Sequence, residues 1–509
     1  MAQMAEPIAR VASGHAETTR AAADVLADGG NAVDALIAAA WTACVAEPVL
    51  CSPGGGGHAL VRGFGRGPVI ADFFTHTPGA PRAGGAEFYP ITGNFGSDVQ
   101  EFHIGLGAAA VPGTVAGLFD LHRRFASRPM PVLAEPAAAL ARAGVRLNEV
   151  QAEALRILEP IVRASDAGAR VFGLPSADAP LPAGGETVTN PELGDFIAAT
   201  ARAGVDDFYR GDVAMSIAAM SMNGGHLTAE DLARYRVRWR RPMHWRLAGD
   251  IRVWSNPPPA FGGLMVALMT RALAARLQRG AAFGSAPHLD ALTEAMRLSE
   301  AQRGELERPD CLASSRLLMQ AFRRLGEDHP RARRGTTHIS VRDRCGNLAG
   351  MTLSNGEGCG RVVPGCGFML NNMLGEEDLN RLGFDRWPRN RRLSSMMAPT
   401  LVQRGNRRML LGSGGSNRIR TAIAQVLCNV MHFGMALNDA VVAPRIHLEA
   451  GRLAVEAGWP AATADWLDRR HPAALRWPGR SLFFGGVHAV ADDAQAADPR
   501  RSGAAWQDG

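Results

Sequence analysis

The sequence predicts a layered α+β sandwich, in which helices segregate to the outer sides of β-sheets. Helical patterns fill residues 16–46 and most of residues 136–323. After Arg334 the pattern changes to alternating strands, and residues 409–432 indicate a strand, a glycine loop and a helix. The chain of 509 residues is long enough to bury a large core. Strands and helices in such separate blocks favour α+β layers over a repeating α/β fold.

The N-terminal region is predicted to begin with two helices. The first covers residues 16–27 and stops at Gly29 and Gly30, and Asn31 then caps a second helix over residues 32–46. Residues 51–57 form a tight turn rather than a phosphate loop, because no Gly-Lys-Ser/Thr follows the glycines. The next expected elements are two strands and a helix, at residues 58–62, 69–74 and 114–125.

The second half is predicted to carry a β-hairpin. The middle of the chain, residues 136–323, is expected to stay mostly helical, with breaks at 180–186 and 256–259. Residues 337–342 and 348–354 then alternate between apolar and polar types around a glycine-containing turn, which is typical of a hairpin. A strand at 409–411, a glycine loop at 412–416 and a helix at 417–432 follow.

Composition excludes several classes of function. The net charge of +6 comes without a module that interleaves basic and aromatic residues, so no nucleic-acid partner is expected. The longest apolar run, residues 35–46, is too short to cross a bilayer, and the first residues lack the apolar region of a secretory signal. Seven cysteines without C-x-x-C spacing predict free thiols in a reducing compartment. These features predict a cytoplasmic enzyme with no membrane partner, no metal site and no cofactor.

The sequence Gly335-Thr336-Thr337-His338 carries the most informative chemistry. A threonine hydroxyl needs a base, and a freed α-amine on the same residue is a base tethered at the right distance. Its ordinary pKa of roughly 7.7–8.0 leaves a neutral fraction near pH 7. The peptide bond before Thr336 must be cut first, and Gly335 tolerates unusual backbone angles for that step. Taken alone, the string fits the start of an ordinary strand better than a catalytic site, and only the motifs that follow it reverse this order.

Further motifs follow one another along nearly the whole chain: Asn31-Ala32-Val33-Asp34-Ala35, Glu47-Pro48, Val111-Pro112-Gly113-Thr114, Leu227-Thr228-Ala229-Glu230-Asp231-Leu232, Pro257-Pro258-Pro259, Pro364-Gly365, Leu370-Asn371-Asn372, Leu393-Ser394-Ser395-Met396 and Asp498-Pro499-Arg500-Arg501. They stand in the order found in γ-glutamyltransferases, and the chain resembles that family over nearly its whole length. The resemblance implies the four-layer αββα sandwich of N-terminal-nucleophile hydrolases. It also implies a precursor cut between Gly335 and Thr336, so that residues 1–335 and 336–509 become large and small subunits intertwined in one αββα domain.

The resemblance also assigns roles to single residues. It makes Thr336 the nucleophile and places the hydroxyl of Thr352 where it hydrogen-bonds that nucleophile; an ordinary strand threonine is the alternative. Gly415 and Ser416 take the oxyanion-donor positions, or Gly414 if the loop shifts by one residue; N–H groups at the start of a helix favour developing negative charge. The pair expected to contact a substrate α-carboxylate is Ser394 and Ser395.

The chain departs from the family where the substrate's amino-acid end would bind. Phe74 stands where the family carries an Arg, and an aromatic ring cannot replace a bidentate guanidinium. Met373 and Glu376 stand where Gln and Asp are expected, although Glu376 can still hold an ammonium group. Ser354 occupies the position of a common Asn, with Asn355 one place later. All these changes point to a less polar and more open substrate pocket.

The implied function is an enzyme that cleaves itself before Thr336 and hydrolyses or transfers an acyl group, of γ-glutamyl type, through a threonine acyl-enzyme. Its partners would be a small-molecule amide or γ-glutamyl substrate and the paired subunits, with a homodimer of the pair possible. One alternative is a specialised acylase, amidase or biosynthetic tailoring enzyme with a non-glutamyl substrate. The other is an uncut, inactive homologue with a binding role.

Overall fold

Two antiparallel sheets form the centre of the protein. The computed structural model describes residues 8–94, 99–247, 249–306, 335–376, 379–380, 383–384 and 386–508. The first sheet has the order β20 (Ala504–Gln507), β1 (Arg10–Ser13), β11 (Thr337–Arg342), β12 (Leu348–Ser354), β2 (Gly56–Gly63), β3 (Arg66–Phe73) and β8 (Arg238–Arg240). The second has the order β19 (Gln495–Ala496), β18 (Gly486–Ala491), β14 (Arg407–Gly414), β13 (Thr400–Arg404), β10 (Arg252–Ser255) and β9 (Met243–Arg246).

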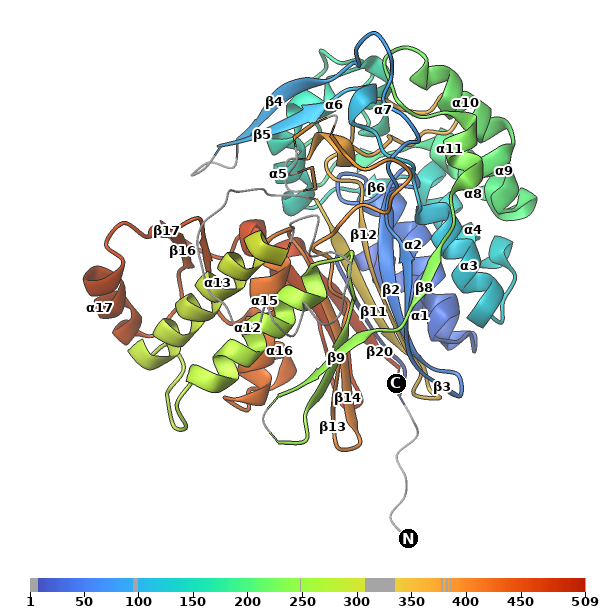
Figure 1. Ribbon diagram of the computed structural model, residues 1–509. Coiled ribbons are helices and arrows are strands. Elements are labelled where there is room, and N and C mark those ends of the chain that lie inside the picture. Colours follow the sequence, from blue (N-terminus) through green and yellow to red (C-terminus); the bar gives the residue numbers. More distant parts are fainter. Residues whose placement is uncertain are drawn as a thin grey trace.

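Helices cover the outer face of each sheet. Between the sheets lies an apolar layer to which both contribute, with Leu60 and Leu348 from the first and Leu410 from the second. Figure 1 shows α1 (Ala16–Ala27) and α2 (Ala32–Ala46) on one side of the strands, and α12 (Gly262–Arg276) and α15 (Arg418–Met431) on the other. This confirms the four-layer αββα sandwich.

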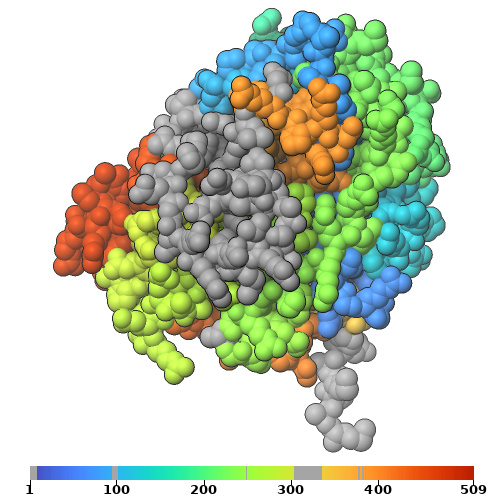
Figure 2. Space-filling view, viewed as in Figure 1, coloured from blue at the N-terminus to red at the C-terminus, as the bar shows by residue number. Residues whose placement is uncertain are grey.

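The remaining elements surround these layers. The helices are α3 (Thr114–Phe125), α4 (Met130–Ala143), α5 (Glu149–Ile157), α6 (Glu159–Val162), α7 (Asp166–Val171), α8 (Pro191–Ala203), α9 (Val205–Arg210), α10 (Asp212–Ser221), α11 (Ala229–Arg234), α13 (Ala286–Leu306), α16 (Leu437–Val442) and α17 (Ala461–Arg470). The short 3₁₀ turns are η1 (Leu106–Ala108), η2 (Met373–Gly375), η3 (Leu482–Phe484) and η4 (Pro499–Arg501). Small sheets contain β4 (Tyr89–Asn94) with β5 (Val99–Ile104), β6 (Val145–Arg146) with β7 (Thr187–Val188), and β15 (Ile446–Glu449), β16 (Arg452–Glu456) and β17 (Leu475–Trp477). In Figure 2 an orange surface region from the chain after β12 lies between the blue residues near β4 and β5 and the green helices.

The two N-terminal helices match their predicted bounds. Asn31 caps α2 by accepting hydrogen bonds from the N–H groups of Val33 and Asp34, while the Asp34 carboxylate accepts one from the Asn31 N–H. Every residue of α2 is buried, because the helix packs on β11 and β12 on one side and on α1 and α4 elsewhere. The cap therefore fixes the start of a helix that the core surrounds.

Replacing Asn31 with alanine is expected to lower the free energy of unfolding by about 0.5–2 kcal/mol, the usual cost of losing an N-cap side chain. The upper part of this range is expected, because the Asn31 amide also donates to Phe125 O at 2.9 Å. Chemical denaturation measures the change, with the exposed Asn223→Ala as the matched control. Equal stability of Asn31→Ala and Asn223→Ala would contradict the capping argument.

Two regions of the second half differ from their predicted elements. Strand β14 continues to Gly414 because Gly414 pairs with Gly486 on β18, so the first three residues of the expected glycine loop are strand, and α15 begins at Arg418. Residues 238–255, expected to be helical, form the edge strands β8 and β9 and strand β10. The sequences Arg-Trp-Arg of β8 and Met-His-Trp-Arg of β9 alternate with a period of two, which favours strands, whereas Arg-Val-Trp-Ser of β10 does not alternate. The end of the expected helical region, residues 307–323, lies outside the described residues.

Both central sheets draw strands from either side of Gly335. In the first sheet, β11 and β12 lie between β1 and β2, and in the second, β13 separates β14 from β10. A cut before Thr336 would thus leave two chains whose strands interleave in the first sheet and lie side by side, β13 against β10, in the second. Of the cysteines, six lie in the described residues and are free, while Cys311 lies outside them. None of the helices found in the described residues combines the length and apolarity that a membrane span requires.

Candidate active site

Thr336 lies immediately before β11, at the end of a central strand of the first sheet. Its side chain is buried, with 3% of the residue exposed. The register pairs Thr337 with Leu353, so the next residues outward, Thr336 and Ser354, lie beside one another. The predicted nucleophile is therefore held by the hairpin and not by a free loop.

The Gly335–Thr336 peptide is surrounded by hydrogen-bonding groups. The Thr336 hydroxyl donates to Gly335 O at 2.7 Å, and the Ser354 hydroxyl donates to the same oxygen at 2.6 Å. The Gly335 N–H donates to the Glu357 carboxylate at 3.0 Å. The hydroxyl of Thr336 thus lies next to the carbonyl that self-cleavage would attack, and a second hydroxyl already polarises that carbonyl.

Glycines allow other chain segments to approach this peptide closely. A Cβ added to Gly414 would lie 2.0 Å from Thr336 O, so the end of β14 can pack against Thr336 only as glycine. A Cβ on Gly335 would lie 2.6 Å from Gly356 O and 2.7 Å from Val49 O. Lack of space for a Cβ therefore accounts for glycine at position 335.

The structure corrects the placement of Thr352. Its hydroxyl lies 2.8 Å from His338 Nδ1, its cross-strand partner, whereas the hydroxyl beside the Gly335–Thr336 peptide belongs to Ser354. Side chains two residues apart on a strand share a face, so Thr352 and Ser354 both point the same way but oppose different residues of β11. In the structure, Ser354 and not Thr352 supplies the hydroxyl beside the nucleophile's peptide.

His338 fills the space between the two sheets behind the nucleophile. Its Nε2 lies 3.0 Å from the Ser340 hydroxyl, and its ring packs close to Gly412. Burial, together with the nearby His488, holds the pKa of His338 well below its ordinary value. The imidazole is therefore neutral at physiological pH and serves the packing of the sheets, which agrees with a mechanism that needs no separate histidine.

The turn after β14 has the backbone geometry expected of an anion-binding loop. Gly415 has a φ of 107° and Ser416 a φ of 52°, which is uncommon for a residue other than glycine. Within the described residues, the N–H groups of Gly415 and Ser416 donate to no acceptor, while their carbonyls accept from Arg418 and Ile419. Two available N–H groups at the start of α15 suit the binding of negative charge.

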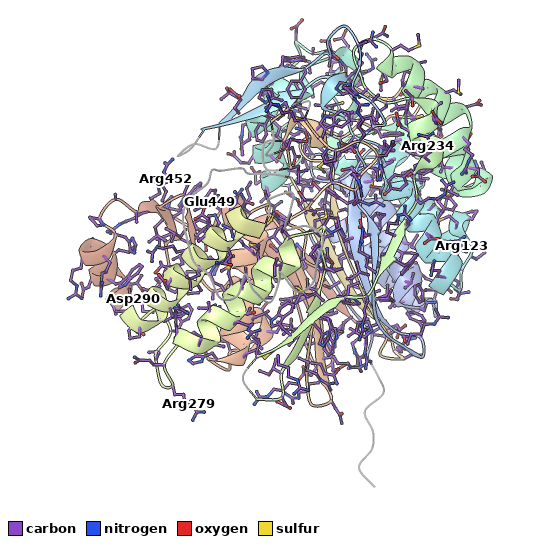
Figure 3. The ribbon with its side chains drawn as sticks, in the orientation of Figure 1. Arg123, Arg234, Arg279, Asp290, Glu449 and Arg452 are labelled. Carbon is purple, nitrogen blue, oxygen red and sulfur yellow. The ribbon has the colours of Figure 1, made fainter. Side chains whose placement is uncertain are left out.

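A buried carboxylate fixes the start of α15 from the other side. Glu449 on β15, labelled to the left of the central strands in Figure 3, accepts from Asn417 Nδ2 at 2.6 Å and lies 3.3 Å from His447 Nε2. Burial alone would raise the pKa of Glu449, but His447 and Arg420 hold it well below its ordinary value. An ionised Glu449 therefore anchors Asn417, which directly follows the turn.

Phe74 lies in an apolar cluster rather than on a polar wall. It is 2% exposed and packs with Met373; the other members are Ala110, Leu374, Trp387, Leu393 and Met397. Below the ring, Arg392 donates to Phe74 O and, at 2.6 Å, to the Tyr235 hydroxyl, and its Nε is 3.2 Å from the Asp72 carboxylate. A guanidinium is thus close to position 74, but it is engaged in holding the backbone and Asp72.

The remaining candidate residues divide into two groups. Glu376 lies near the scissile peptide, because a Cβ on Gly356 would be 2.2 Å from Glu376 Oε1. Asn355 points elsewhere, with its amide 3.4 Å from Met369 O. Ser395 is buried and its hydroxyl accepts from the Met397 N–H at 3.0 Å, whereas Ser394 is half-buried. Glu376 is thus linked to the Gly335–Thr336 peptide through Gly356, which itself packs on Gly335.

Residues with no assigned role also reach the site. Arg501 donates from Nη1 to Thr336 O at 3.1 Å, and the Thr337 hydroxyl donates to Glu47 at 2.7 Å. Arg501 belongs to the motif Asp498-Pro499-Arg500-Arg501, and Glu47 belongs to the motif Glu47-Pro48. What the sequence did not indicate is that these motifs meet at the start of β11.

Two facing antiparallel sheets between helix layers, with a threonine at the start of a central strand behind a glycine, define an N-terminal-nucleophile hydrolase. The chain belongs to the γ-glutamyltranspeptidase family, whose model matches residues 18–507.

Relatives and solved structures agree with this assignment. The glutathione hydrolase proenzyme of Escherichia coli is 30% identical over 90% of this chain and 84% of its own length. The acylase ACY 1 proenzyme of Pseudomonas sp. (strain SE83) is 28% identical over 94% of this chain and 89% of its own. The crystal structure of cephalosporin acylase from Bacillus halodurans has a TM-score of 0.81, with 23% identity over 98% of this chain and 96% of that one. The protein is thus an enzyme of this family, and its fold is shared with an acylase.

Proposed function

We propose that the chain cleaves itself between Gly335 and Thr336 and then hydrolyses or transfers γ-glutamyl-type acyl groups through a Thr336 ester. The observation that carries this proposal is the pair of hydroxyls, from Thr336 and Ser354, at 2.7 and 2.6 Å from Gly335 O. Family membership supports the same reaction class, because curated relatives are named proenzymes.

In the maturation step, the Thr336 hydroxyl oxygen attacks the Gly335 carbonyl carbon. The Ser354 hydroxyl stabilises the negative charge that develops on Gly335 O. The Thr336 nitrogen takes up the proton that the hydroxyl loses, the C–N bond breaks, and the Gly335 acyl group is left as an ester on Thr336 Oγ1. Water hydrolyses this ester, which releases the Gly335 carboxylate and frees both the hydroxyl and the α-amine of Thr336.

In the turnover step, the Thr336 hydroxyl oxygen attacks the substrate carbonyl carbon while the freed α-amine of Thr336 takes the hydroxyl proton. The N–H groups of Gly415 and Ser416 stabilise the oxyanion, and the departing amine receives the proton. Water or an acceptor amine then attacks the acyl ester and regenerates Thr336. We assign the binding of a substrate ammonium to Glu376, and its position beside Gly356 supports this assignment.

Replacing Glu376 with glutamine is expected to raise KM for γ-glutamyl p-nitroanilide about tenfold with little change in kcat, because a charge-assisted contact to the substrate ammonium is lost in both ground and transition states. Steady-state kinetics of the matured enzyme test this. Glutaryl p-nitroanilide, which lacks the ammonium, should show no change, and the exposed Glu135→Gln should behave as wild type. An equal effect on both substrates would contradict a role for Glu376 in ammonium binding.

The apolar cluster around Phe74 and Met373 favours a second candidate, an acylase for groups without an α-carboxylate. Arg392, whose guanidinium contacts Phe74 O, is also engaged with Asp72 and is therefore not free to bind a substrate carboxylate. The same assay separates the two functions: a higher kcat/KM for γ-glutamyl than for butyryl p-nitroanilide supports the γ-glutamyl assignment, and the reverse order supports the acylase.

A further inference from the structure

Glu47 is a buried carboxyl group directly beneath the start of β11. It ends helix α2, is 3% exposed, and accepts from the Thr337 hydroxyl at 2.7 Å and the Thr18 hydroxyl at 3.3 Å. A Cβ on Gly14 would lie 2.5 Å from Glu47 Oε2, so the chain before α1 closes over the carboxyl group. The first two helices and β11 thus meet at one acidic side chain.

Arg501 holds the same peptide from another element. Its Nη1 donates to Thr336 O at 3.1 Å, so the Thr336–Thr337 peptide unit and the Thr337 hydroxyl are held by Arg501 and Glu47 respectively. The guanidinium is buried under Gly414 and Gly486. Its Nε has no hydrogen-bond partner among the described residues. Arg501 therefore contacts Thr336 itself, and Glu47 contacts the residue that follows it.

The surroundings of Glu47 contain few other titratable groups. Helix α1 contributes the neutral Thr18, β11 contributes Thr337, η4 contributes the cationic Arg501, and the segment after α2 contributes the thiol of Cys51. Burial raises the pKa of Cys51 well above its ordinary value, so that thiol stays neutral. Arg501 is the charged group that acts on Glu47.

We infer that Glu47 is a positioning residue that fixes Thr336 for self-cleavage through Thr337, and that its ionisation sets the pH range in which maturation is fast. The inference rests on the proposed self-cleavage. A hydroxyl bound to an ionised carboxylate makes a stronger and shorter hydrogen bond than one bound to a neutral carboxyl. Ionised Glu47 therefore holds the start of β11, and with it the Thr336 hydroxyl, more firmly than protonated Glu47 does.

The surroundings of Glu47 shift its ionisation into the pH range near neutrality. Burial raises the pKa of Glu47 to about 7, against the opposing effects of the Thr337 and Thr18 hydroxyls and Arg501. Because this folded-state pKa lies above the ordinary value, the contribution of Glu47 to stability is full in acid and is lost as pH rises through about 7. The ionised form thus positions the nucleophile at some cost in stability.

Maturation gives a clean test, because the Thr336 α-amine is still in a peptide bond and cannot titrate. Freshly translated chain from a cell-free system is chased at pH values from about 5.5 to 8.5, and cleavage is followed by gel. We expect the wild-type rate to rise roughly tenfold between about pH 6 and pH 8, as the ionised fraction of a group with a pKa near 7 does. Glu47→Gln should lose this rise, while the exposed Glu135→Gln should keep it.

Two further variants keep the test decisive if Glu47→Gln does not fold. Thr337→Val should flatten the profile in the same way, and Thr337→Ser, which keeps the hydroxyl, should restore it. Retention of the wild-type pH profile in Glu47→Gln or in Thr337→Val would overturn the role of Glu47 while leaving self-cleavage in place. A wild-type chain that stays uncut at every pH would overturn both the inference and the proposed function.

Discussion

Replacing Thr336 with alanine is expected to leave the chain uncut and to abolish amide turnover. The hydroxyl that donates to Gly335 O at 2.7 Å is both the attacking group in maturation and the acyl carrier in turnover. Loss of the covalent nucleophile of a serine hydrolase lowers kcat by a factor on the order of 10⁶. Gel analysis and a γ-glutamyl p-nitroanilide assay measure the two effects.

The matched variants separate chemistry from folding. Thr336→Ser keeps a hydroxyl and should still cleave, although more slowly, whereas the exposed Thr187→Ala should behave as wild type in both assays. A Thr336→Ala protein that retains appreciable turnover would remove Thr336 from the nucleophile role. A Thr336→Ala protein that is cut at the same bond would place the cleaving group elsewhere.

Replacing Ser354 with alanine is expected to slow self-cleavage about 10²-fold or more. The Ser354 hydroxyl donates to Gly335 O at 2.6 Å, the atom on which charge develops when Thr336 attacks, and the loss of one such donor typically costs 10²–10³ in rate. The rate of cleavage of freshly made chain, followed by gel, is the direct measure.

Thr352→Val is the matched control for Ser354→Ala, because it removes a buried hydroxyl two residues earlier on the same face of β12. The hydroxyl of Thr352 contacts His338, so its loss should change stability more than the cleavage rate. A slower cleavage in Thr352→Val than in Ser354→Ala would restore Thr352 as the partner of the nucleophile and contradict the observed register.

Local patterns in the sequence were sufficient for several elements. Asn31, which caps α2 together with Asp34, predicted the start of that helix correctly. The alternation of apolar and polar residues on either side of the turn at 343–347 predicted both strands of the hairpin. Residues 238–255 carry a weaker signal, because β8 and β9 alternate over only three and four residues and β10 does not alternate. Edge strands with few residues carry little periodic signal.

The position of Ser354 beside Thr336 follows from the sequence of the hairpin, although the family resemblance indicated Thr352. A hairpin in which Arg342 pairs with Leu348 must bring position 336 beside position 354, and simple counting from the turn gives this result. The contacts of Glu47, Arg392 and Arg501 are different in kind. They join segments that are hundreds of residues apart, and no local pattern specifies which buried carboxyl group a distant arginine will face.

The intact mass of the protein, measured fresh and after incubation, with the N-terminal sequence of any smaller fragment, tests self-cleavage most directly. Two chains are expected, with the smaller beginning Thr336-Thr337-His338. They should remain together under native conditions, because both central sheets contain strands from each side of Gly335. A single uncut chain with no turnover would instead support an inactive homologue, and an uncut chain that still hydrolyses amides would contradict the α-amine of Thr336 as the base.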